Sequence, residues 1–274
     1  MTHNEIGWRV IGIRMPALLV LIGLCVLTGP SDLLPTILAQ SHPPIDIRHR
    51  RGSTVTSSNW SGYAVTGASG SVSDAKGTWT VPAIQGTCPA QNQYASMWVG
   101  IDGYNSKTVE QIGTDSDCQS GVPTYYAWYE FYPHWAYTIN AVPIRSGDVV
   151  TAEVKYNTSS RQFTVSITNL TTAKSFSISS KAAQADRSSA EWIVEAPWSG
   201  GVLPLANFWR TFFGDATNLN TATLNGSTRV IGAYADANRF QITMEDGNGA
   251  PKAIPSDLAA DGSSFTDDWI SAGP

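Results

Sequence analysis

Residues 124–132 read TYYAWYEFY, and this run of aromatic side chains decides the fold. Aromatic and β-branched residues are enriched in strands, and successive side chains of a strand point to opposite faces. Trp128, Glu130 and Tyr132 then share one face, whereas Tyr129 and Phe131 share the other. Because both faces carry large rings, we expect one face to pack in the core and the other to line a groove.

The same strand pattern continues along the chain after residue 52. Short stretches rich in Val, Ile, Thr, Tyr, Phe and Trp alternate with Gly, Ser, Asn and Asp clusters that mark turns. Only residues 181–188 and 255–260 offer a helical turn or two, and residues 247–274 are expected to be extended or looped. The pattern predicts an all-β fold, a sandwich of two large antiparallel sheets, with strands at 60–66, 77–81, 94–101, 107–113, 124–132, 148–156, 161–168, 190–196, 206–213, 228–234 and 239–245.

The first 52 residues differ from the rest. Arg9 and Arg14 precede the apolar residues 17–27, a pattern typical of a secretory signal and shorter than the roughly 20 residues of a membrane span. We expect a signal peptide at 1–39, a linker or short pro-segment at 40–52 and one domain at 53–274. The alternative is an uncleaved membrane anchor. In a pro-segment, the basic residues 48–51 would cover an acidic groove.

Charge and cysteine content narrow the class of protein. The chain has 274 residues and net charge −5, and residues 1–52 hold five of its 17 basic and three of its 22 acidic side chains. The remainder carries 12 basic and 19 acidic side chains, net −7, which disfavours nucleic-acid partners. In an exported chain, the remaining cysteines Cys88 and Cys118 favour a disulfide over a metal site. Two free thiols are the alternative.

Histidine is scarce in this chain. Of four histidines, only His134 follows residue 52, whereas a Ser-His-Asp or Cys-His hydrolase needs an imidazole base and zinc sites usually need two or more His or Cys ligands. We therefore expect no cofactor and no metal, and we look to carboxylates for acid–base chemistry. Burial among aromatic rings raises a carboxyl pKa, which makes candidates of Glu110, Glu130, and either Glu191 or Glu195.

Six blocks of sequence carry a resemblance to a known family. They are SNWSGYAV (58–65), MWVGIDG (97–103), VEQIGTD (109–115), YYAWYEFYP (125–133), NLTT (169–172) and AEWIVE (190–195). In this order they resemble the glutamic peptidase family, the eqolisins. The sequence departs from the fungal pattern at Tyr126, where fungal members carry an aspartate, and this difference indicates a bacterial-type branch.

The resemblance implies a fold, an activity and a site. The fold would be a lectin-like double antiparallel β-sandwich with a concave groove, and the activity that of a secreted, acid-active endopeptidase. Glu195 would activate a water as general base, and Gln111 would stabilise the oxyanion. The residues placed in or around the groove are Trp98, Asp102, Asp115, Trp128, Glu130 and Tyr132.

Two other readings of the same strands stay open. A jelly-roll glycoside hydrolase would also pair glutamates, here Glu130 and Glu195, on an aromatic β-sandwich. A non-catalytic lectin-like carbohydrate-binding module would make no use of Gln111. The peptidase reading expects a peptide or unfolded protein as substrate, no nucleic acid, no stable membrane association after signal removal, a monomer, and an extracellular location.

Overall fold

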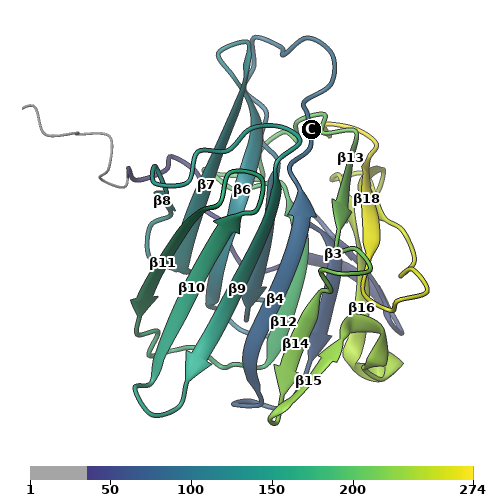
Figure 1. Cartoon of the computed structure of the whole chain (residues 1–274). Helices are drawn as coiled ribbons and strands as arrows, with labels where there is room; N and C mark the ends of the chain where they lie inside the picture. Colours follow the sequence, from purple (N-terminus) through teal and green to yellow (C-terminus); the bar gives the residue numbers. More distant parts are fainter. Residues whose placement is uncertain (1–35, 274) are drawn as a thin grey trace, which may run out of the picture. The chain divides into compact units, whose positions relative to one another are not determined.

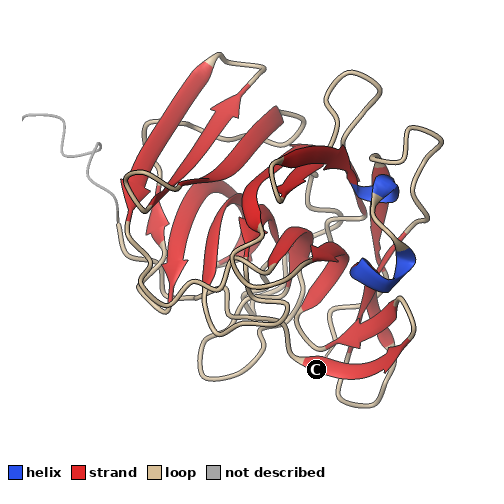
Figure 2. Ribbon diagram, turned by 90° about the horizontal axis from the view of Figure 1, so that it is seen from below, coloured by secondary structure: helices blue, strands red, loops and turns tan. Residues whose placement is uncertain are grey.

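Strands make up most of the described structure, which is a computed structural model covering residues 36–273 (Figures 1 and 2). The prediction of an all-β sandwich is confirmed. The helices described in this range are two short 3₁₀ turns, η2 (Ile231–Ala233) and η3 (Asp236–Asn238). Within residues 36–273, no helix is long and apolar enough to cross a membrane. The proposed signal sequence falls largely on residues 1–35, outside the described range.

One sheet, called here the site-bearing sheet, carries the residues of interest. Its strands pair in an unbroken series and run antiparallel, except that β16 and β2 are parallel. From one edge to the other they are β8 (Tyr137–Thr138), β7 (Val122–Tyr132), β6 (Val109–Gln119), β5 (Ser96–Ile101), β12 (Ser189–Glu195), β3 (Trp60–Thr66), β16 (Arg239–Glu245), β2 (Thr54–Ser57) and β1 (Ile47–Arg51).

The second sheet packs against one face of the first (Figure 1). Its strand β4 pairs with β9, β13 and β14, and β17 joins the two sheets by pairing with both β16 and β18. Its strands are β11 (Lys174–Ser180), β10 (Gln162–Asn169), β9 (Val149–Asn157), β4 (Val72–Thr80), β14 (Thr221–Leu224), β15 (Ser227–Val230), β13 (Arg210–Phe213), β18 (Phe265–Trp269) and β17 (Pro251–Pro255).

The two sheets differ in how many faces they bury. In β10 of the second sheet, Phe163, Val165 and Ile167 are buried in the core, and the residues between them are partly exposed, as expected for an antiparallel sheet with one wet face. The strands β5 and β12 of the site-bearing sheet are buried at every position. A second layer of contacts must therefore cover the outer face of the site-bearing sheet.

Most predicted strands are found close to their expected bounds, and those at 60–66 and 239–245 match in full. The strand expected at 206–213 begins only at Arg210, and the one expected at 228–234 ends at Val230, where the 3₁₀ turn η2 follows. The helical turns expected at 181–188 and 255–260 are wrong, because the structure places no helix there. The tail, described to residue 273, is extended or looped as expected, and its residues 251–255 and 265–269 pair as strands. These strands are short, and the hydrogen bonds to distant partners that hold them leave no local pattern in the sequence.

The disulfide between Cys88 and Cys118 is confirmed, with the two Cα atoms 5.3 Å apart. It ties the loop before β5 to the end of β6, across 30 residues of chain. Replacing both cysteines with serine should lower the free energy of unfolding by about 3–4 kcal/mol, because the unfolded chain regains loop entropy. Denaturant unfolding of the variant and of the reduced wild type checks this, and equal midpoints for oxidised wild type and variant would contradict it.

Candidate active site

Strand register brings Glu195 and Gln111 to one face of the site-bearing sheet. Glu195 on β12 lies opposite Ser96 on β5, and Gln111 on β6 lies opposite Gly100 on the same strand. Ser96 and Gly100 are four residues apart, an even number, so both cross-strand rows face the same way. The two side chains therefore converge from the strands on either side of β5.

Trp98 occupies the row between these two side chains. A Cβ atom on Gly113 would lie 2.6 Å from the Trp98 Cβ, and one on Gly100 would lie 2.7 Å from its ring. Both glycines thus leave room for the indole to lie across the sheet. In that position its Nε1 donates a hydrogen bond of 2.8 Å to Oε2 of Glu195.

The Glu195 carboxyl is fully buried. Burial raises its pKa well above the ordinary value, and the charge of Glu130 adds to this, whereas hydrogen bonds from Trp98, Trp60 and Asn59 oppose it. The Asn59 amide lies 3.3 Å from Oε1. Glu195 is therefore a carboxyl that holds a proton readily and has donors ready to stabilise its ionised form.

Gln111 faces a peptide carbonyl of the chain itself. Its Nε2 donates to the backbone oxygen of His42 at 2.6 Å and lies 3.3 Å from Oε2 of Glu130. Its Oε1 accepts no hydrogen bond from the described residues. The amide therefore holds a carbonyl oxygen with one end and keeps an acceptor at the other.

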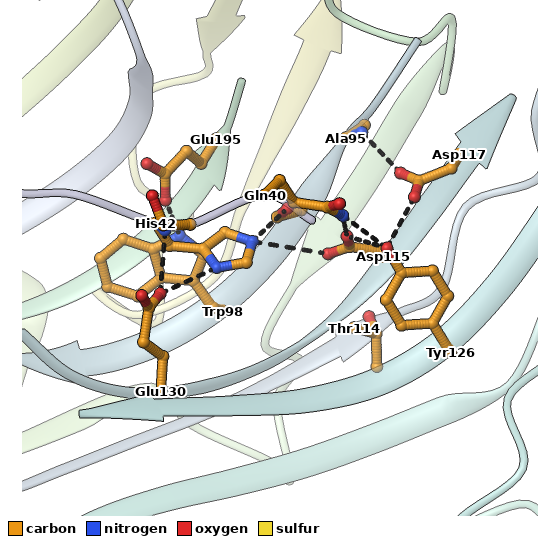
Figure 3. Close-up of polar contacts among 12 residues, drawn as sticks. Gln40, His42, Ala95, Trp98, Thr114, Asp115, Asp117, Tyr126, Glu130 and Glu195 are labelled. Atoms are coloured by element: carbon orange, nitrogen blue, oxygen red, sulfur yellow. Dashed lines mark hydrogen bonds and ion pairs between the residues drawn. The ribbon is translucent and has the colours of Figure 1, made fainter. Parts of the chain in front are cut away.

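His42 lies in the middle of the site (Figure 3). Its ring stacks on Trp128 with centroids 3.6 Å apart, its Nδ1 lies 3.0 Å from Oε2 of Glu130, and its Nε2 lies 3.1 Å from Oγ of Ser96. The expectation that His134 is the one histidine of the folded part is therefore wrong, because His42 is fully buried. His134 is exposed beside a turn.

Comparison with known proteins agrees with this geometry. Residues 58–253 match the peptidase A4 family. The chain belongs to that family. It is 32% identical to aspergillopepsin-2 of Aspergillus niger over 194 residues, 63% of this chain and 66% of the relative, and 35% identical to scytalidopepsin B of Scytalidium lignicola over 143 residues, 50% and 51% of the two chains. It thus spans somewhat under two thirds of the first relative and about half of the second.

Solved structures show the same fold in this family. A crystal structure of scytalido-glutamic peptidase with a transition state analog inhibitor matches with a TM-score of 0.63 and 25% identity, covering 78% of this chain and 98% of that one. Aspergilloglutamic peptidase from Aspergillus niger matches with a TM-score of 0.55 and 31% identity, covering 65% of this chain and 99% of that one. The resemblance to the glutamic peptidases is confirmed.

In this peptidase A4 chain, an acidic pair lies beside the His42 ring. The hydroxyl of Tyr126 is 2.8 Å from Oδ2 of Asp115 and 2.8 Å from Oδ2 of Asp117. Burial and the neighbouring Asp115 raise the pKa of Asp117 well above its ordinary value. Since the phenol has one hydrogen for two carboxyls, a protonated Asp117 can donate to the phenol oxygen while the phenol donates to Asp115.

The remaining predicted groove residues fall into two sets, three that lie at the site and one that does not. Tyr132 lines a cavity of about 340 Å³ together with Ser41, Pro43 and Trp198, and Trp128 and Glu130 contact His42. Asp102 does not face this group: its carboxylate accepts hydrogen bonds from the backbone of Arg187 and Ser188 at 2.7 and 2.9 Å.

Sequence reasoning missed the donors Asn59 and Trp60 and the whole of segment 40–46. The block SNWSGYAV contains both donors, but its pattern alone does not show that β3 lies beside β12. Segment 40–46 resembles a proline-rich linker, and a linker has no period from which burial could be read. Among residues 36–273, no group of three or more His, Cys, Asp or Glu side chains could hold a metal ion.

A second group of buried acids stabilises the fold in acid. Burial raises the pKa of Glu110 and of Glu191 well above their ordinary values, and nearby Asp102 adds to both shifts. A carboxyl whose folded pKa is raised stabilises the fold fully below its unfolded pKa of about 4.3, and loses this contribution as pH rises through the folded value. The fold should therefore weaken from acid toward neutral pH.

We expect Glu191→Gln to flatten this dependence, because the amide cannot ionise. Thermal unfolding across about pH 4 to 8 should show a smaller drop for the variant, with about 1.4 kcal/mol gained near neutrality for each pKa unit removed. The half-exposed Glu245 offers a matched control, since Glu245→Gln should leave the wild-type slope. Parallel curves for wild type and Glu191→Gln would contradict the assignment.

Proposed function

We propose that this chain is an acid-active endopeptidase in which Glu195 and Gln111 hydrolyse a peptide bond. The observation that carries the proposal is the 2.6 Å hydrogen bond from Gln111 Nε2 to a backbone carbonyl, on the face that also carries Glu195. A peptide carbonyl so held is polarised for attack. Membership of the peptidase A4 family supports the same reaction.

The reaction needs one proton carrier and one fixed donor. Glu195 as carboxylate takes a proton from water, and the water oxygen adds to the carbonyl carbon. Gln111 Nε2 donates to the oxyanion that forms, a task for an amide because it cannot itself exchange a proton. Protonated Glu195 then delivers its proton to the leaving nitrogen, the C–N bond breaks, and the carboxylate is restored.

The environment of Glu195 supports activity in acid. The first cause of its raised pKa is burial, and segment 40–46 contributes to that burial because Asn59 contacts both Glu195 and Pro44. Once the segment leaves, water reaches the carboxyl and its pKa falls toward the ordinary range of Glu. The base is then more readily ionised in acid than it is when the segment is bound.

Peptide or unfolded protein is the proposed substrate, and secretion is the proposed location. A disulfide persists in oxidising compartments, and Cys88 and Cys118 form one here. We also propose a monomer, which size-exclusion chromatography would test. Family membership removes the ground for the glycoside hydrolase and lectin readings. Glu130 contacts His42 and Gln111.

Removing either member of the dyad should stop proteolysis without unfolding the protein. Glu195→Gln should abolish digestion of a denatured protein across about pH 2 to 7, because no base remains. Gln111→Ala should lower kcat about 10²- to 10³-fold, the usual loss for one oxyanion donor. Glu153→Gln on the second sheet is the control, and thermal unfolding confirms folding. Full digestion by both variants would refute the dyad.

Removing the indole donor should shift the pH profile rather than abolish activity. Trp98→Phe keeps an aromatic ring but removes the indole N–H, whose hydrogen bond lowers the pKa of Glu195. The acidic limb of the kcat/KM profile should therefore move to higher pH. Trp79→Phe is the matched control, because its Nε1 donates to Thr114 in the core. An unchanged acidic limb in Trp98→Phe would show that this bond does not tune Glu195.

A further inference from the structure

Segment 40–46 (QSHPPID) is bound across the active site like an extended peptide. Ser41 and Trp198 exchange two backbone hydrogen bonds of 2.9 and 3.0 Å, as in a β-bridge. The backbone N–H of His42 donates to Glu130 at 2.9 Å, and the backbone N–H of Ile45 donates to the carbonyl of Gly103 at 3.2 Å. These contacts use backbone atoms that any peptide possesses.

The carbonyl groups of this segment meet the donors of the site one after another. Gln111 donates to the carbonyl of His42 at 2.6 Å, Trp60 Nε1 to that of Pro43 at 3.2 Å, and Asn59 Nδ2 to that of Pro44 at 3.3 Å. Asn59 also lies 3.3 Å from Glu195. Gln111 therefore holds the carbonyl of the His42–Pro43 bond, and the next two carbonyls are held by Trp60 and Asn59, the donors that also act on Glu195.

Two side chains anchor the segment. His42 lies between the Trp128 ring and the carboxyl of Glu130, with Nε2 4.0 Å from Oδ1 of Asp115. Gln40 Nε2 donates to Asp115 at 2.9 Å and contacts the Tyr126 hydroxyl at 2.6 Å. His42 is fully buried and Gln40 is 5% exposed. Both polar side chains are thus held at the acidic face.

The arginines of the region are not the residues that cover the site. Strand β1 (Ile47–Arg51) is exposed at every position, Arg50 lies over the ring of Phe240, and Arg48 is 3.7 Å from Asp46. The sequence suggested that basic residues 48–51 cover an acidic groove. The structure instead places Gln40 and His42, which precede them in the chain, against Asp115 and Glu130.

We propose that segment 40–46 is a built-in, substrate-like inhibitor, which presents the His42–Pro43 bond to Glu195 and Gln111 and stays uncut because residue 43 is proline. This inference rests on the proposed function and concerns the regulation of the same site. Because the segment belongs to the same chain, its effective concentration at the site is high, and an added substrate must compete with it.

Proline protects the bond through its nitrogen. Cleavage adds a water oxygen to the His42 carbonyl carbon, breaks the C–N bond and places the proton held by Glu195 on the departing nitrogen. In proline that nitrogen belongs to a ring that fixes φ near −65° and replaces the N–H with a methylene. The nitrogen therefore cannot turn freely to receive the proton. Pro43 and Pro44 also preorganise the segment, which lowers the entropy cost of binding.

The test is self-cleavage of the full chain in acid. Pro43→Ala should restore an ordinary amide at the dyad, and intact-mass spectrometry should then show a product that begins at residue 43. Wild type should stay intact at this bond. Pro44→Ala is the matched control: it changes the neighbouring proline but leaves Pro43 at the dyad, so it should stay intact as well. The double variant Pro43→Ala, Glu195→Gln should also remain uncut.

A second measurement does not depend on self-cleavage. His42→Ala removes the stacked ring and its hydrogen bond to a carboxylate, so the segment should bind at least about tenfold more weakly. On an added peptide, the variant should show an apparent KM lower by a similar factor and an unchanged kcat. A role of His42 in folding alone would not produce this split.

Four results would overturn the inference. They are an intact Pro43→Ala chain, a cut at residue 43 that persists with Glu195→Gln, a cut in Pro44→Ala, and an unchanged KM in His42→Ala. If any one of them occurs while wild type digests added protein, the inhibitor proposal fails and the proposed function stands. If wild type and all single variants digest nothing, the proposed function itself fails, and the inhibitor proposal fails with it.

Discussion

Carboxyl groups buried without a lysine or arginine partner are the constraint on which this structure depends, and the His42 imidazole lies 3.0 Å from Glu130 and 4.0 Å from Asp115 among them. Within residues 36–273, no lysine or arginine forms an ion pair with Glu195, Glu130, Asp115 or Asp117. A buried acid without a cation keeps its proton or shares one through hydrogen bonds. Burial accordingly raises the pKa of Glu195, Asp117, Glu110, Glu191 and Asp267. The same desolvation thus favours both the fold and the proposed chemistry in acid.

Tyr126 shows how this buried acidic site accommodates a phenol where fungal members carry an aspartate. Its hydroxyl lies between two carboxyls, where one proton from Asp117 and one from the phenol satisfy both contacts. An aspartate at this position would add a third carboxyl to two that already share protons. The phenol supplies polar contact without another charge, so the acidic character of this part of the site rests on Asp115 and Asp117.

Much of the fold could be predicted from the sequence because alternation along a strand is local. The aromatic run in β7 identified a strand with two apolar faces, and strand parity grouped Glu130 with Trp128 and Tyr132. The pairing of Glu195 with Gln111 came from the family resemblance, and the strand register later placed the two on one face. Which strands are neighbours is a property of the whole chain, so the donors Asn59 and Trp60 could not be inferred from it. The prediction that Asp102 lies at the groove has another difficulty. Its sequence block was recognised, but its carboxylate accepts hydrogen bonds from the backbone at residues 187–188.

Segment 40–46 was hardest to anticipate because its structure exists only against its partner. A segment with two prolines and no period looks like solvated linker, and its burial depends on a surface built by residues that lie from 13 to 157 positions later in the chain. The same argument explains why β5 and β12 are buried on both faces. The segment covers part of their outer face, which is why these strands carry residues suited to burial on both faces.

Occupancy and proton affinity are therefore coupled at Glu195. In the proposed reaction, opening the site to water lowers the pKa of the carboxyl, so that it can accept a proton in acid. In that reaction, a peptide that binds as segment 40–46 does displaces bulk solvent but leaves the one reacting water, and burial then raises the proton affinity of the carboxylate. The base thus becomes stronger at the moment when a water must lose its proton, and the proton it gains is held until the nitrogen departs. In the proposed reaction, binding energy from the backbone contacts on either side of the scissile bond is in this way converted into a stronger base.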